Sequence, residues 1–183
     1  MKNKKIIFMG SPNIAAEHLN AMFENNIDIE AVFTQPPKKQ SRGLKYIKSA
    51  VHTLAEKNNI KVFYPNKFCD ETISQLKLIK PDLIVVMAYG KLLPKEVLNV
   101  SKFGCINIHV SILPRWRGAA PIEHSLMNGD KETGISIIKL IQKLDAGPII
   151  AKKVIPIPKN FNKLDLTNRL TSLGTKLLIN IFS

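Results

Sequence analysis

The sequence predicts an α/β fold with a Rossmann-like, doubly wound, mostly parallel sheet that carries an antiparallel hairpin at its edge. Three observations predict it. Short apolar runs alternate with segments of helical spacing through the first part of the chain. Residues 82–88 have the composition of a continuous apolar strand, as in a parallel sheet buried on both faces. Two later strand-like runs are separated only by a short turn, as in a hairpin.

The first part of the chain repeats strand and helix. Gly10, Ser11 and Pro12 follow the first apolar run, and Ser11 is expected to cap a helix that has Pro12 in its first turn. A loop is expected over residues 35–48. The predicted strands are residues 5–9, 27–34, 60–64 and 82–88, and the predicted helices begin after Pro12 and cover residues 49–58 and 69–80.

The pattern changes beyond Phe103. Residues 103–110 alternate as in a strand, and residues 119–127 have helical spacing that ends at Asn128-Gly129. The hairpin strands are expected at residues 134–142 and 148–157, with a helix over residues 164–181. A chain of 183 residues is long enough for one hydrophobic core, so we expect one domain over residues 1–183.

The composition is that of a globular cytoplasmic protein. Hydrophobic residues make up 45% of the chain, and mean hydropathy is near zero. No apolar run approaches the roughly 20 residues that span a bilayer, and the first run is too short for a signal peptide. Cys69 and Cys105 have neither disulfide nor metal-ligand spacing, so we expect two reduced thiols and no metal.

The formal charge of +13 suggests a polyanionic partner. Lysine accounts for 23 of the 27 basic residues, however, which an AT-rich genome also produces. Residues 35–48 contain no acid and carry one tyrosine, and they are either a solvated surface loop or a basic arm that grips a nucleic-acid backbone. The basic side chains of this loop are Lys38, Lys39, Arg42, Lys45 and Lys48.

Asn107 and His109 are the best candidates for catalysis. In a strand they share one face, and near its carboxyl end an amide and an imidazole can stabilise an oxyanion and move protons. Taken alone, such a histidine is more often structural, and His18, His52 and His124 in helical patterns are expected to be structural. Asp145 before Ala146-Gly147 is also ordinary turn chemistry.

Ligands of open α/β sheets bind beyond the carboxyl ends of the strands. We therefore expect Gly10-Ser11-Pro12, Tyr89-Gly90, the Asn107 and His109 pair and the Asp145 turn to converge there. Gly10-Ser11-Pro12 lacks the full GxGxxG spacing of nucleotide-binding sites. A helix cap is therefore a better interpretation of this segment than a nucleotide site.

Several motifs together resemble a known family. They are MGSP, FTQP before the basic loop, VVMAYGKLLP, GCINIHVSILPRWRGAAPIEHSL and GDKETGISIIKLIQKLDAGPI. The chain resembles the catalytic domain of methionyl-tRNA formyltransferases, within the folate-dependent formyltransferases. The most specific pieces are N-x-H followed by SILPRWRGAAPI, and the L-D-x-G downstream. The RWRGAAPI segment and the FTQP loop favour the tRNA enzymes over relatives that act on glycinamide ribonucleotide or amino sugars.

The resemblance implies transfer of a formyl group from 10-formyltetrahydrofolate to the α-amine of methionyl initiator tRNA, without a metal. It implies Asn107, His109 and Asp145 as catalytic residues. It also implies a tRNA-binding role for Arg42 and its lysine neighbours in the basic loop. The folate-binding residues that it implies are Met87, Ala88, Tyr89, Gly90, Leu92, Ser111, Ile112, Leu113 and Pro114.

Two departures from the family pattern matter. The family has a C-terminal β-barrel domain that helps to hold tRNA, and we expect this chain to end in the start of the linker helix before it. Asn13-Ile14 replaces the acidic-aromatic pair expected after the first loop. We expect a monomer without membrane contact. The alternatives are formyl transfer to a small amine, such as an amino sugar or glycinamide ribonucleotide, and a catalytically inactive RNA-binding module.

Overall fold

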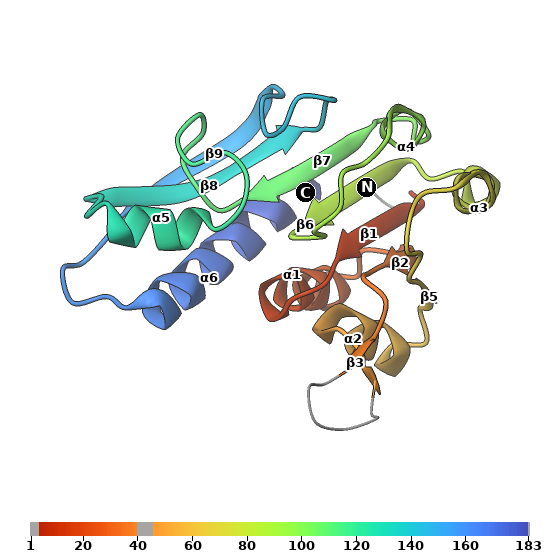
Figure 1. The fold of residues 1–183 in the computed structure, drawn as a ribbon, viewed down its shortest axis with the longest axis horizontal. Coiled ribbons are helices and arrows are strands. Elements are labelled where there is room, and N and C mark those ends of the chain that lie inside the picture. The colour runs from red at the N-terminus through yellow and green to blue at the C-terminus, as the bar shows by residue number, and fades with distance from the viewer. Residues whose placement is uncertain (1–3, 40–45, 183) are drawn as a thin grey trace. The chain divides into compact units, whose positions relative to one another are not determined.

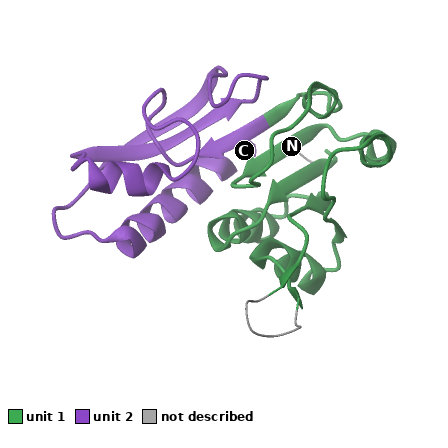
Figure 2. Cartoon of the chain, viewed as in Figure 1, with its two compact units in different colours: residues 1–105 green, residues 106–183 purple. Residues whose placement is uncertain are grey.

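The structure is a computed structural model that describes residues 4–39 and 46–182. The chain forms two compact units, Met1–Cys105 and Ile106–Ser183 (Figure 2). The expectation of a single domain over residues 1–183 stays a prediction.

Unit 1 is built on four parallel strands. β1 (Ile6–Gly10) pairs with β2 (Ile29–Phe33) on one side and with β6 (Leu83–Met87) on the other, and β5 (Lys61–Phe63) pairs with β2. Every residue of β1 and β6 is buried. Their continuous apolar runs follow from this burial, because both faces of a parallel sheet are covered.

Four helices belong to unit 1: α1 (Asn13–Glu24), α2 (Ala50–Lys57), α3 (Asp70–Ile79) and the short α4 (Lys95–Leu98). The first two lie side by side (Figure 1). The buried face of α1 has helical spacing and consists of Ala15, His18, Leu19 and Met22. Ser49 caps α2 by accepting a hydrogen bond from the His52 N–H at 3.0 Å. Sequence spacing had assigned no element to the segment that contains α4.

The expected Ser11 cap of α1 is wrong. Pro12 occupies the N-cap position, and no side chain caps the helix. The Ser11 hydroxyl instead accepts hydrogen bonds from the Gln35 N–H at 3.1 Å and from the Thr34 hydroxyl at 3.3 Å. Ser11 therefore connects the end of β1 to the end of β2. Its hydroxyl makes these long-range hydrogen bonds instead of capping the helix that follows it.

The loop expected over residues 35–48 also contains two short strands. β3 (Lys38–Lys39) and β4 (Tyr46–Ile47) pair antiparallel, and all four of their residues are exposed. With two residues each and no buried face, they lack the hydrophobic periodicity by which strands are recognised in a sequence.

Unit 2 contains an antiparallel arrangement of β7 (Cys105–His109), β8 (Glu132–Lys139) and β9 (Ile149–Pro156). Two helices, α5 (Pro121–Met127) and α6 (Lys163–Phe182), lie along the β8 and β9 hairpin (Figure 1). Leu166, Leu170, Gly174 and Leu178 form the buried stripe of α6 at intervals of one helical turn. The Glu123 carboxylate of α5 pairs with the Lys163 ammonium at 2.8 Å.

The strand order is β5-β2-β1-β6-β7-β8-β9, with β9 at the edge. The parallel pairings are among β1, β2, β5 and β6, and the antiparallel pairings are among β7, β8 and β9. The predicted α/β class, with a mostly parallel sheet and an antiparallel hairpin at its edge, is confirmed.

Candidate active site

Asn107 and His109 are neighbours on one face of β7. They pair across the sheet with Ile138 and Ser136 of β8, in the alternating register of an antiparallel ladder. Both side chains meet the carboxylate of Asp145. The Asn107 Nδ2–H donates to Asp145 Oδ1 at 3.3 Å, and His109 Nδ1 lies 3.6 Å from Asp145 Oδ2. The three residues that the sequence predicts as catalytic therefore form one cluster within unit 2.

Asp145 is held by the turn that joins β8 to β9. Its φ of 43° lies in the left-handed region, which aspartate tolerates better than most residues. The turn returns so closely to β8 that a Cβ on Gly147 would lie 1.7 Å from the Lys139 carbonyl oxygen, so only glycine fits there. The Gly118 N–H donates to Asp145 Oδ2 at 2.8 Å, which gives the carboxylate a second fixed partner.

The hydrogen bonds of His109 fix which ring nitrogen carries a proton. His109 Nε2 lies 2.8 Å from the carbonyl oxygen of Trp116, and a carbonyl only accepts, so Nε2 is the donor. The other nitrogen, Nδ1, faces the Asp145 carboxylate at a separation longer than a hydrogen bond. His109 and Asp145 are 6% and 7% exposed, so bulk water screens their interaction only weakly.

Asn107 is the most accessible of the three side chains, since it is half-buried. Its amide nitrogen has two hydrogens, and the bond to Asp145 uses one of them. The second N–H is available to a bound group. An accessible amide donor can stabilise an oxyanion, and a histidine beside a carboxylate can move a proton. The cluster therefore has the groups that both tasks require.

The loop after β7 is braced from β8. The Ser136 hydroxyl accepts a hydrogen bond from the Leu113 N–H at 3.1 Å and donates to the Ser111 carbonyl at 2.8 Å. The Ser111 hydroxyl donates to the Arg115 carbonyl at 2.6 Å. Of the folate-binding residues that the sequence predicts in this loop, Ser111 and Leu113 are thus buried and occupied, whereas Ile112 is half-buried and Pro114 is exposed.

The other predicted folate-binding residues lie in unit 1, at the end of β6 and in the turn that follows it. Ala88 and Gly90 are exposed, with φ of 46° and 77°, and Leu92 is 81% exposed. Met87 and Tyr89 are buried. The Gln35 side chain holds this turn by donating from Nε2 to the carbonyl oxygens of Tyr89 at 3.1 Å and of Gly90 at 3.3 Å.

The side chain of Tyr89 is buried. Its hydroxyl has no hydrogen-bond partner, and burial raises its pKa to about 12. Its ring meets that of Phe68 with centroids 6.1 Å apart. Lys91, next but one along the turn, donates to the carbonyl oxygens of Pro65 and of Asn66, the latter at 2.8 Å, and burial lowers its pKa.

Gly10, Ser11 and Tyr89 come together in unit 1, where the Ser11 hydroxyl lies 3.5 Å from the Tyr89 carbonyl oxygen. Asn107, His109 and Asp145 come together in unit 2. The expectation that all of these segments converge on one site stays a prediction.

The basic loop is only partly described. Arg42 and Lys45 lie outside the described residues. Lys38 and Lys39 are exposed on β3, and the Lys39 ammonium lies 5.6 Å from the centre of the Tyr46 ring. The Lys48 ammonium pairs with the Glu56 carboxylate of α2 at 2.7 Å, and this hydrogen bond lowers the pKa of Glu56. An acid from a neighbouring element thus neutralises one of the five predicted tRNA contacts.

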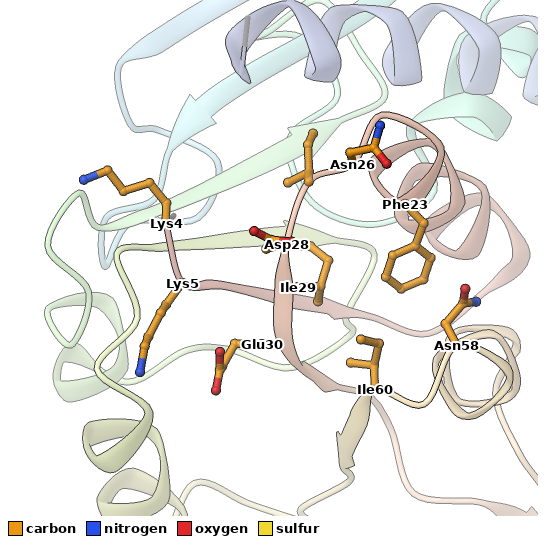
Figure 3. A pocket seen from close by; sticks show the side chains of 10 residues that line it. Lys4, Lys5, Phe23, Asn26, Asp28, Ile29, Glu30, Asn58 and Ile60 are labelled. Carbon is orange, nitrogen blue, oxygen red and sulfur yellow. The ribbon is translucent and has the colours of Figure 1, made fainter. Parts of the chain in front are cut away.

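A cavity of about 660 Å³ lies elsewhere in unit 1 (Figure 3). Its lining includes Lys5, Phe23, Glu30 and Ile60. It lies near the N-terminal ends of β1 and β2, and none of the residues predicted as catalytic or binding lines it. Ligands of open α/β sheets bind at the carboxyl ends of the strands, so this cavity is not the candidate active site.

Residues 4–182 match the family described as Formyl transferase. The chain belongs to this family. It is 47% identical over 181 residues to a methionyl-tRNA formyltransferase of Wolbachia sp. subsp. Drosophila simulans (strain wRi), an alignment that covers 98% of this chain and 60% of that protein. It is 47% identical over 178 residues to a methionyl-tRNA formyltransferase of Pelagibacter ubique (strain HTCC1062), with 96% of this chain and 57% of that protein covered. The chain thus spans less than two thirds of the length of these relatives.

Solved structures give the same fold for this formyl transferase chain. The phosphoribosylglycinamide formyltransferase from Streptococcus pneumoniae TIGR4 superposes with a TM-score of 0.81 at 19% identity, covering 98% of this chain and 99% of that one. At this identity the likeness concerns the fold alone, and the formyltransferase fold that the sequence predicts is confirmed.

Several residues of the site in this formyl transferase chain escape sequence reasoning. Gly118 and Trp116 contribute main-chain atoms, which any residue carries, so their types give no signal. Ser136 is the one polar residue in the run GISII (residues 134–138), and that exception is a signal that a buried partner exists. Asp130 follows Asn128-Gly129 and looks like turn chemistry.

The part of the chain that the structure describes has neither a metal-binding cluster nor a membrane-spanning helix. Within residues 4–39 and 46–182, no group of three or more histidine, cysteine, aspartate or glutamate side chains is placed to hold a metal ion. Over the same residues, no helix combines the length and the apolar character needed to cross a membrane. Cys69 is exposed and Cys105 is buried, and both are free thiols.

Proposed function

We propose that this chain catalyses the transfer of a formyl group from 10-formyltetrahydrofolate to the α-amino group of methionyl initiator tRNA. The observation that carries the proposal is the cluster of Asn107, His109 and Asp145 in a member of the formyl transferase family. The curated relatives at 45% to 47% identity have the name methionyl-tRNA formyltransferase, which favours tRNA over a small amine.

The reaction begins when the lone pair of the neutral amine attacks the formyl carbon. The electrons of the C=O bond move to oxygen, and the tetrahedral intermediate carries an oxyanion. The free Nδ2–H of Asn107 and a protonated Nδ1 of His109 are the donors that we assign to this oxygen. Both bind the oxyanion more strongly than the ground-state carbonyl, so they lower the barrier.

Collapse of the intermediate re-forms the C=O bond and breaks the bond between the formyl carbon and N10 of the folate. N10 takes the electron pair and one proton, and the amine nitrogen loses one. Asp145 accepts the amine proton directly or through water, and the bond from Gly118 N–H keeps the carboxylate in place for this step. The products are N-formylmethionyl-tRNA and tetrahydrofolate.

We assign folate-binding residues in each unit separately, in the turn after β6 of unit 1 and in the loop after β7 of unit 2. Exposed apolar groups beside exposed backbone suit a flat heterocycle with a polar edge, and Ala88, Gly90 and Leu92 are the exposed residues of this turn. Ile112 and Pro114 are the accessible residues of the second segment. Lys38 and Lys39 are the exposed described lysines that we assign to the tRNA backbone.

The test is a formyl-transfer assay with 10-formyltetrahydrofolate and charged initiator tRNA that measures N-formylmethionine. Asn107→Ala is expected to lower kcat/KM roughly 10²- to 10³-fold, and Asp145→Asn roughly 10²- to 10⁴-fold. Glu123→Gln is the matched control, because it also removes a paired carboxylate of unit 2 but not one in the cluster.

Parallel assays with glycinamide ribonucleotide and an amino sugar separate the substrates. Turnover of either small amine with none of methionyl-tRNA would overturn the tRNA assignment and retain formyl transfer. Binding of tRNA without turnover of any amine would leave an inactive RNA-binding module and would overturn the proposal.

A further inference from the structure

Asp130 collects three hydrogen bonds from the loop that follows β7. Its carboxylate accepts from Arg115 Nε at 3.1 Å and from Arg115 Nη2 at 2.6 Å, in the bidentate geometry typical of arginine and carboxylate. Trp116 Nε1–H donates to Asp130 Oδ2 at 2.6 Å. Asp130 itself follows α5 in the chain, so these bonds join two segments of unit 2 that are remote in sequence.

The ring of Trp116 contacts two flat groups. The Arg115 guanidinium lies 4.3 Å from the ring centroid, and the His124 ring stacks at 5.2 Å with an interplanar angle of 13°. Both contacts fix the plane of the indole, and the bond to Asp130 fixes its rotation within that plane. The side chain of Trp116 thus has three partners, Arg115, His124 and Asp130.

The ion pair itself does not explain so many contacts. An exposed pair of arginine and carboxylate contributes little to stability, and the Arg115 side chain is 56% exposed. The Asp130 side chain, however, is only 12% exposed, and the hydrogen bonds from Arg115 hold the pKa of Asp130 below its usual range. The carboxylate therefore stays ionised while it anchors the indole.

The backbone of Trp116 gives this anchoring a consequence for His109. Trp116 has a φ of 58°, a left-handed conformation that bulky residues rarely adopt. In this conformation the carbonyl oxygen of Trp116 meets His109 Nε2 at 2.8 Å. Two residues further on, the Gly118 N–H meets Asp145 at 2.8 Å. One short segment thus orients both the imidazole and the carboxylate of the cluster.

We propose that Asp130 is a positioning residue for His109 and Asp145: by anchoring the indole of Trp116 it holds residues 116–118 where the Trp116 carbonyl and the Gly118 N–H bind the pair. Asp130 touches none of the reacting atoms. The effect on the reaction rests on the proposed formyl transfer, whereas the effect on the geometry of His109 does not.

Two readouts test the proposal on the full chain. The first is the ¹H–¹⁵N signal of His109 Nε2–H, identified by its absence in His109→Gln. The hydrogen bond to the Trp116 carbonyl should slow its exchange with solvent in the wild type, and Asp130→Ala should shift this signal or abolish it. This readout requires no substrate and no assumption about the reaction.

The second readout is the division of the loss between kcat and KM. Asp130→Ala is expected to lower kcat roughly 10- to 100-fold, because misplacement of a catalytic group by about 1 Å costs a loss of this order. KM should change much less than kcat, because Asp130 binds neither substrate. Asp130→Asn retains an acceptor for the indole and loses the charge facing Arg115, so its loss should be intermediate.

The matched control is Asp165→Asn, which removes another carboxylate of unit 2, one that accepts its hydrogen bond locally from the Asn162 N–H at 3.1 Å. It should leave both readouts unchanged. An unchanged His109 signal in Asp130→Ala overturns the proposal, and so does an equal loss of kcat in Asp165→Asn. A wild type that is inactive on methionyl-tRNA, together with a lost His109 signal in Asp130→Ala, overturns the proposed function but supports the positioning of His109 by Asp130.

Discussion

Unit 1 and unit 2 each bury a histidine, and the two rings differ in what surrounds their second nitrogen. His18 of α1 is 0% exposed, and its Nδ1–H donates to the Ile14 carbonyl at 2.7 Å. His109 of β7 donates from Nε2–H to the Trp116 carbonyl at 2.8 Å. Each ring thus has one nitrogen fixed as a donor to a backbone carbonyl. The two rings therefore differ only in what lies next to the other nitrogen.

The second nitrogen of His18 has no partner, whereas that of His109 faces a carboxylate. Burial lowers the pKa of His18 to about 4, so its ring is neutral at physiological pH. His109 has Asp145 at 3.6 Å, and the amide of Asn107 bonds to the same carboxylate. A buried imidazole fills space when its second nitrogen has no partner, and it can exchange protons when that nitrogen faces an acid.

The first prediction concerns activity, where the difference between the two histidines should be largest. His109→Gln is expected to lower kcat/KM for formyl transfer roughly 10²- to 10⁴-fold, because it removes a donor and a proton carrier. His18→Gln should leave kcat/KM nearly unchanged, because His18 bonds to the Ile14 carbonyl and not to a residue of the cluster. Steady-state assays of both variants measure this difference. Equal losses would contradict the prediction, because the carboxylate that faces His109 would then not distinguish it from His18.

The second prediction concerns the pH dependence of stability, and it rests on His18 of unit 1. The pKa of His18 is about 4 in the folded chain and near 6.5 when unfolded, so between these values the unfolded state binds more protons. The free energy of unfolding should therefore decrease as the pH falls from about 6.5, with a loss of roughly 3 kcal/mol from this residue near pH 4.

Urea unfolding of the wild type and of His18→Gln, at about pH 7.5 and pH 5, isolates this contribution. The difference between the two pH values should be smaller in the variant by roughly 2 kcal/mol, because His18 is then absent from the titration. Glutamine at position 18 alters stability at both pH values alike, so the double difference removes that effect. A pH dependence that is the same in both proteins would show that His18 does not carry it.

The same contrast explains how much of the molecule follows from the sequence. His18 bonds to Ile14 four residues away, within one helical turn, and the apolar stripe of α1 places it inside. The strands β1 and β6 are likewise local, because continuous apolar runs record burial on both faces. Elements whose pattern lies in neighbouring residues were therefore predicted with nearly correct bounds.

The surroundings of His109 are not local. Asp145 is separated from Asn107 by 38 positions, and the Trp116 carbonyl and the Gly118 N–H are backbone atoms without a type. The types of Asn107, His109 and Asp145 could be selected by resemblance to a family, but the partners that orient them depend on the path of the chain. Ser11 is a second example, because its hydroxyl accepts a hydrogen bond from the Gln35 N–H and does not cap the helix that follows it.

The smallest expected effect compares an unpartnered hydroxyl of unit 1 with a partnered one of unit 2. Among the described residues, Tyr89 Oη is a buried polar atom without a hydrogen-bond partner, whereas the Ser136 hydroxyl has two. Tyr89→Phe should leave the free energy of unfolding unchanged or raise it by about 1 kcal/mol, and Ser136→Ala should lower it by about 1 to 3 kcal/mol. Chemical denaturation measures both values. A loss in Tyr89→Phe as large as that in Ser136→Ala would mean that the Tyr89 hydroxyl is bonded in solution. The presence of a hydrogen-bond partner would then no longer distinguish the buried Ser136 hydroxyl of unit 2 from the buried Tyr89 hydroxyl of unit 1.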